Sequence, residues 1–105
     1  MLRIYGTQLE VLAELRPVIE RIERRDADLA RQMRRAASSV VLNTAEGMHA
    51  QGKNQRARYH TALGSMRETL ACIEVSEALG YLRSVEPGLL RRIDDVLAVL
   101  YRLSA

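Results

Sequence analysis

The chain has 105 residues, a formal net charge of +3 and 48% hydrophobic residues, with no Phe, no Trp and one cysteine. This length fits one domain, so we expect residues 1–105 to fold as a single domain with an aliphatic core. One cysteine excludes an internal disulfide and cannot hold a metal alone, so we expect a reduced, cytoplasmic protein. No apolar run approaches the roughly 18 residues of a membrane span, and no signal peptide is indicated.

Charge is unevenly distributed along the chain. Residues 27–67 carry seven basic and two acidic side chains, a net charge of +5, whereas the remainder carries −2. A basic segment attracts phosphate groups, but solvated arginines and lysines are also ordinary on helical surfaces. Both interpretations stay open at this point.

The first helix is predicted to begin at Thr7, because Thr7 and Glu10 have the spacing of a capping box and follow Gly6. The apolar residues after it recur with a helical period over a wide arc. Pro17 lies inside this pattern and removes one backbone donor. We therefore expect a kink near residues 13–17 within one helix, rather than two helices.

A second helix is predicted to begin at an N-cap, either Asp26 or Asp28, and to end at Gly47. Glycine takes the left-handed C′ conformation at little cost, which favours Gly47 as the C-terminal residue. Residues 36–39 are all small, and small side chains permit a close approach of two helices. This run is therefore expected to seat the second helix against the third.

Residues 48–53 are predicted to form a loop that ends at Asn54, the expected N-cap of a third helix. This helix is expected to run for about 25 residues and to end at Gly80 as a C′ glycine. Pro87 is expected to open a fourth helix, because its missing N–H is tolerated at the first helical position. Four helices with short turns predict an all-α, antiparallel up-down-up-down four-helix bundle.

The third helix is predicted to have two apolar faces, which indicates contacts with more than one neighbour. One is a heptad-like seam of Tyr59, Leu63, Met66, Leu70 and Ile73. The other consists of Ala71, Val75, Ala78, Leu79 and Leu82. The partner of the second face can be the same chain or another subunit.

Two blocks resemble a known family, the four-helix-bundle proteins encoded by intervening sequences in bacterial 23S rRNA genes. Residues 34–37 are similar to its Arg-Arg-Ala-Ala run, and residues 43–47 to its Asn-x-Ala-Glu-Gly. Residues 64–68 are similar to its Gly-Ser-x-x-Glu, and residues 79–81 to its Leu-Gly-Tyr. The structural motif positions within these blocks are Asn43, Glu46, Gly47, Gly64, Glu68 and Gly80. The chain departs from the pattern at residues 40–42, where many members have an Ile-Pro pair, which predicts a straighter second helix.

The resemblance implies a compact bundle that assembles into a ring-forming homo-oligomer, commonly a pentamer, with no established catalysis. A related protein, the accessory variability determinant of diversity-generating retroelements, is a basic pentameric barrel that binds nucleic acid and a reverse transcriptase. Because a fold does not fix a function, this relation supports nucleic-acid binding here only by analogy.

Reactive chemistry finds little support in the residues. Glu46 and His49 have the Glu-x-x-His spacing of di-iron bundles, but the second such motif is missing, so we expect no metal and no cofactor. Glu46 and Glu68 are expected to pair with Arg34, Arg35 or Arg67, although ligand contact stays open. Cys72 is expected to be a small buried residue rather than a nucleophile, and Asn43 to lie between helices.

Two functions are consistent with these observations. The first is a non-enzymatic homo-oligomeric bundle that binds nucleic acid, particularly RNA or alternatively DNA, or a nucleic-acid-processing partner, through basic helix surfaces. The second is a structural or protein-interaction module without nucleic-acid binding. The candidate nucleic-acid contacts are Arg34, Arg35, Lys53, Arg56, Arg58 and Arg67.

Overall fold

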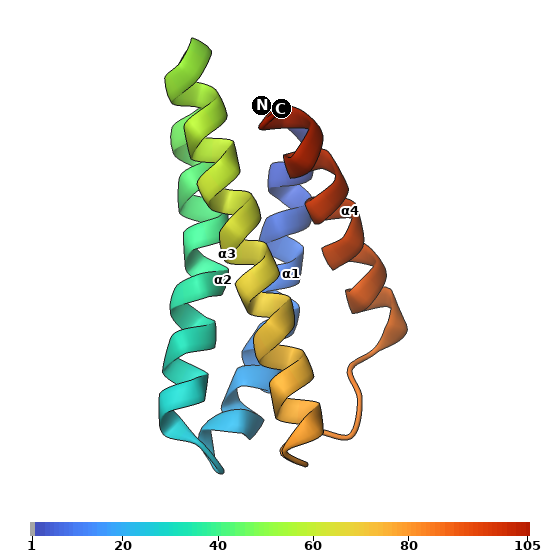
Figure 1. Ribbon diagram of the computed structural model, residues 1–105. Helices are drawn as coiled ribbons and strands as arrows, with labels where there is room; N and C mark the ends of the chain where they lie inside the picture. The colour runs from blue at the N-terminus through green and yellow to red at the C-terminus, as the bar shows by residue number, and fades with distance from the viewer. Residues whose placement is uncertain (1) are drawn as a thin grey trace.

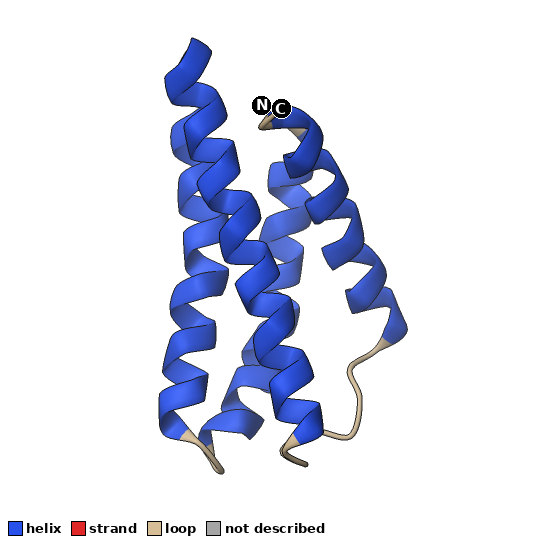
Figure 2. Ribbon diagram, in the orientation of Figure 1, coloured by secondary structure: helices blue, strands red, loops and turns tan. Residues whose placement is uncertain are grey.

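Four helices make up the structure, a computed structural model that describes residues 2–105 (Figure 1). They are α1 (Arg3–Glu23), α2 (Ala27–Met48), α3 (Gly52–Ala78) and α4 (Pro87–Leu103). Each helix packs against the next, and α4 returns to α1, so the helices form an antiparallel up-down-up-down bundle. Figure 2 shows only helices and loops over the described residues. The predicted fold class is confirmed.

The core is aliphatic and receives side chains from all four helices. The heptad-like seam predicted for the third helix points into it, and Tyr59 is buried there as expected. Burying one such aliphatic side chain contributes about 1.5–3 kcal/mol before entropic costs. The largest fully buried apolar residues are Leu15, Ile22, Met33, Val40, Met66, Ile73, Ile93, Val96 and Leu100.

The start of α1 differs from the prediction. The helix begins at Arg3 after Leu2, which makes no side-chain cap, so Thr7 and Glu10 lie within the helix and form no capping box. Burial of Ile4 in the core accounts for the additional turn, because packing contributes more to a helix than propensity does. α1 continues through Pro17 as one helix, as predicted.

Of the two N-caps predicted for the second helix, Asp26 is the one found, and the predicted helix ends at Gly80 and Pro87 are confirmed. Asp26 is the N-cap of α2, and its Oδ1 accepts a hydrogen bond from the backbone N–H of Leu29 at 3.0 Å. Gly80 has a φ of +78°, the left-handed conformation expected of a C′ glycine. Tyr81 then folds back, and its hydroxyl donates to Asp26 Oδ2 at 3.2 Å. Pro87 is the first residue of α4.

The prediction for Gly47 is wrong. α2 continues through Gly47 to Met48, and Gly47 is buried with an ordinary helical backbone. A Cβ at this position would lie 2.5 Å from Cε1 of the Tyr59 ring. Glycine is therefore required here for the close approach of α3 rather than for ending the helix.

The predicted loop at residues 48–53 and the N-cap at Asn54 are also wrong. α3 begins at Gly52, which has a φ of +57°, and the N-cap is Gln51. Because one left-handed glycine reverses the chain, no long loop is needed. The side-chain amide of Gln55 fastens this turn by donating to the carbonyls of Gly47 at 2.9 Å and Ala50 at 3.0 Å.

α2 and α3 form the most extensive helix contact in the bundle. The hydroxyls of Ser39 and Ser65 hydrogen-bond across it at 2.8 Å, and Ala36 and Ala62 are buried. The small-residue run thus seats α2 against α3, as predicted. Figure 1 shows that this hairpin projects beyond the end of the bundle where the two termini lie. The beginning of α3 is at the projecting tip.

Candidate nucleic-acid interface

The structure places all six candidate nucleic-acid contacts on the surface, but it divides them into two groups. Arg34 forms an ion pair with Glu23 at 3.4 Å, and Arg58 forms one with Glu46 at 3.4 Å. The other four form no ion pair with any residue from 2 to 105. They are Arg35, Lys53, Arg56 and Arg67.

One side of α3 carries three of the four candidate contacts that form no ion pair with a described residue. Lys53, Arg56, His60 and Arg67 follow one another at i, i+3, i+7 and i+14, which places them on one side of a helix, and all are exposed. We call these residues the α3 edge. The edge extends for about 21 Å at 1.5 Å per residue.

α3 changes the sign of its charge midway. Residues 52–67 contain four basic residues and no acidic residue. Residues 68–78 contain Glu68, Glu74 and Glu77 and no basic residue. Lys53, Arg56 and His60 therefore have no neighbouring carboxylate along their own helix, which preserves their attraction for an anion, whereas Arg67 is followed directly by Glu68.

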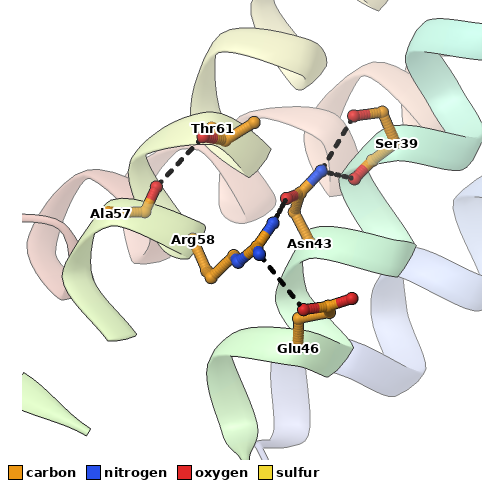
Figure 3. A network of polar contacts seen from close by, with 6 residues as sticks. All are labelled: Ser39, Asn43, Glu46, Ala57, Arg58 and Thr61. Carbon is orange, nitrogen blue, oxygen red and sulfur yellow. Dashed lines mark hydrogen bonds and ion pairs between the residues drawn. The ribbon is translucent and has the colours of Figure 1, made fainter. Parts of the chain in front are cut away.

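A polar network joins α2 to α3 beside this edge (Figure 3). Arg58 donates to Asn43 Oδ1 at 3.4 Å while it pairs with Glu46, and Asn43 donates to the backbone oxygen and Oγ of Ser39, both at 3.0 Å. Asn43 thus lies between helices, as predicted. The network holds the guanidinium of Arg58 against a carboxylate, so Arg58 is a helix-joining residue.

The two motif glutamates have partners other than the arginines predicted for them. Glu46 pairs with Arg58, and Glu68 Oε2 accepts a hydrogen bond from Gln32 Nε2 at 3.3 Å. Both contacts cross from α2 to α3. The register of the two helices decides these partners, and the sequence alone does not supply that register.

A hollow of about 530 Å³ lies next to the network. It presents one carboxylate, one guanidinium, an amide and a hydroxyl, which suits a polar ligand. The hollow is lined by Glu46, Ala50, Asn54, Ala57, Arg58 and Thr61.

Cys72 is buried, and burial followed by the charge of Glu68 raises the pKa of its thiol. No group of three or more potential metal ligands is present among residues 2–105.

The fold and the surface together define an all-α four-helix bundle with a basic edge on its projecting hairpin. The family model described as 23S rRNA-intervening sequence protein matches residues 2–102. The chain belongs to this 23S rRNA-intervening sequence protein family.

A solved structure from Bacteroides thetaiotaomicron is similar to this chain, with a TM-score of 0.80 and 15% sequence identity. The similarity covers 96% of this chain and 97% of that one. That protein is described as one with unknown function from the S23 ribosomal protein family. At this identity the similarity supports the fold alone. A search of curated proteins found no match.

In the part of the chain that the structure describes, every helix is too short or too polar to cross a membrane.

Proposed function

We propose that this chain is a non-enzymatic, cytoplasmic homo-oligomer that binds nucleic acid, RNA in particular, or a nucleic-acid-processing partner. The α3 edge is the observation that carries the proposal. Lys53, Arg56 and Arg67 are exposed and form no ion pair with a described residue. Neutralising phosphates with such groups releases counterions, which drives binding.

Several observations favour binding of the α3 edge to the phosphates of a nucleic acid rather than to a carboxylate of this protein. The α3 edge is about 21 Å long at the helical rise, which is enough for several consecutive phosphates. Arg34 and Arg58 already contact glutamates and are expected to contribute less than the edge. The family description, 23S rRNA-intervening sequence protein, also links relatives of this chain to an RNA gene.

Assembly is the second part of the proposal. Exposed apolar side chains on α1, α2 and α3, including Leu9, Leu42 and Leu79, favour contacts between subunits. A pentamer is the form that the family resemblance suggests. Repeating the α3 edge around a homo-oligomer would multiply weak phosphate contacts into useful affinity.

Filter binding at graded salt tests the nucleic-acid part, with single-stranded and hairpin RNA as probes and a DNA of the same sequence beside them. We expect binding at 50 mM salt and a dissociation constant about tenfold or more higher at 200 mM. Absence of binding at low salt, or affinity insensitive to salt, would contradict it. Capture of a protein partner that resists nuclease treatment would instead favour the alternative, a structural or protein-interaction module.

A further inference from the structure

A groove runs along the surface between α1 and α2. It encloses about 750 Å³, and its apolar lining includes Leu9, Leu12, Ala13 and Ile19 from α1. Leu9 is 45% exposed. A neighbouring hollow shares Arg34 and Ser38 with the groove and reaches Leu42, which is 64% exposed. We call this continuous surface the α1–α2 groove.

A second apolar surface lies on the C-terminal half of α3. Ala71, Val75 and Ala78 of α3 and its C-cap Leu79 are spaced at i, i+4, i+7 and i+8, so they share one side of the helix. All four are exposed, Val75 to 44% and Leu79 to 56%. We call them the α3 ridge. They belong to the second apolar face predicted for this helix, of which only Leu82 turns into the core.

The groove and the ridge lie on different sides of the bundle. α3 packs against α2 and α4, and α1 packs against the same two helices, so α1 and α3 are diagonal neighbours. Figure 1 shows α3 in front of α1. The groove is concave between two helices, whereas the ridge is the convex outer side of one helix. Such a ridge fits a groove between two helices better than it fits another ridge.

The charges beside the two surfaces are complementary. Glu74 and Glu77 beside the ridge form no ion pair with a described residue, so two facing ridges would bring unpaired carboxylates together. On the groove, Arg35 is exposed and unpaired within residues 2–105, while Arg16 and Arg34 already contact glutamates on α1. Arg67 lies one turn before Ala71 on the same side and offsets one of these two carboxylates, so the excess charge stays negative at the ridge and positive at the groove.

We propose that the α3 ridge of one copy binds in the α1–α2 groove of the next copy, as a head-to-tail contact. This inference rests on the assembly part of the proposed function and specifies its two surfaces. Because the contact joins unlike surfaces, an open assembly keeps a free groove at one end and a free ridge at the other, so it either closes into a ring or grows as a filament. The ridge occupies the acidic half of α3 and adjoins the α3 edge at Arg67, whereas Lys53, Arg56 and His60 lie three or more turns before Ala71 and stay uncovered.

Complementation between two variants tests the contact. The groove variant carries Leu9→Glu and Leu42→Glu, and the ridge variant carries Val75→Arg and Leu79→Arg. All four side chains are exposed, so the bundle should fold, which circular dichroism checks. The matched control is Tyr101→Arg, which changes an apolar side chain that is 63% exposed and lies on α4, outside both surfaces.

Light scattering gives the mass of each sample. We expect wild type and Tyr101→Arg to be equally assembled. The groove variant alone and the ridge variant alone should each have the monomer mass of 11.9 kDa. A mixture of the groove and ridge variants should form a one-to-one dimer. A groove or ridge variant that keeps the wild-type mass, or a mixture of the two folded variants that stays monomeric, would overturn this inference but not the assembly part of the proposed function. A monomeric wild type would also overturn the assembly part of the proposed function, and RNA binding would still be judged separately by filter binding.

Discussion

The ring of Tyr59 packs directly on the backbone of Gly47, so closely that a methyl group at Gly47 would lie 2.5 Å from Cε1 and 2.8 Å from Cδ1. Tyr59 is buried, and the core around it leaves the ring little room to move. This contact joins α2 to α3 near the turn between them.

Gly47→Ala should therefore destabilise the protein, although alanine is the better helix former. We expect a loss of about 1–3 kcal/mol from overpacking, measured by urea unfolding. The control is Gly64→Ala, because a Cβ at Gly64 meets no heavy atom within 4 Å. That change should stabilise the helix by about 0.5–1 kcal/mol. Equal effects of the two substitutions would show that the ring does not restrict Gly47.

Gln8 is a buried amide without a partner. It is 2% exposed, and neither Nε2 nor Oε1 has a hydrogen bond within the described chain. Gln8→Met should raise stability by about 1–3 kcal/mol, because it removes an unsatisfied polar group. Gln55→Met should lower stability, because Gln55 donates two hydrogen bonds across the α2–α3 turn. Thermal unfolding of both variants checks these signs, and a lower melting temperature for Gln8→Met would contradict the assignment.

Asp26 has two structural partners, the N–H of Leu29 and the hydroxyl of Tyr81. Asp26→Ala should cost about 1 kcal/mol for the lost helix cap. It should also loosen the turn after α3, because Tyr81 loses its acceptor. Asp28→Ala is the control, since Asp28 is exposed and pairs only with Arg31 within α2. Hydrogen exchange at residues 79–85 should accelerate in the first variant and remain unchanged in the second.

Burial, followed by the charge of Glu68, raises the pKa of the Cys72 thiol. As the pH rises above about 8.5, the unfolded chain loses this proton first and then binds fewer protons than the folded chain. Stability should therefore fall with rising pH in this range. The melting temperature of wild type should drop more than that of Cys72→Ala between pH 7 and pH 10. Parallel pH profiles for the two proteins would contradict this.

The sequence predicted the elements that depend on local signals. Apolar periodicity located the helices, and Asp26, Gly80 and Pro87 marked ends that the structure confirms. The prediction for Gly47 fails because glycine serves both helix ends and close packing. Only its contact with Tyr59 on the next helix distinguishes the two uses. The prediction of one domain over residues 1–105 stays a prediction.

The candidate site was predictable only in part. The basic residues were visible in the sequence, and the spacing from Lys53 to Arg67 in an acid-free stretch was available as a signal for the α3 edge. The pairing of Arg34 with Glu23 and of Arg58 with Glu46 cannot be predicted from the sequence, because it depends on the register between helices. Their separation from the unpaired basic residues therefore required the structure.

The salt dependence of RNA binding by a charge-matched pair of variants tests the central claim most directly. The first variant carries Lys53→Ala, Arg56→Ala and Arg67→Ala, and the second carries Arg83→Ala, Arg91→Ala and Arg102→Ala, which removes the same charge from exposed positions elsewhere. If the α3 edge binds single-stranded RNA, only the first variant should lose affinity, and its slope of log K against log salt should fall by about 2. Equal slopes and equal affinities for the two variants would contradict the assignment of the α3 edge.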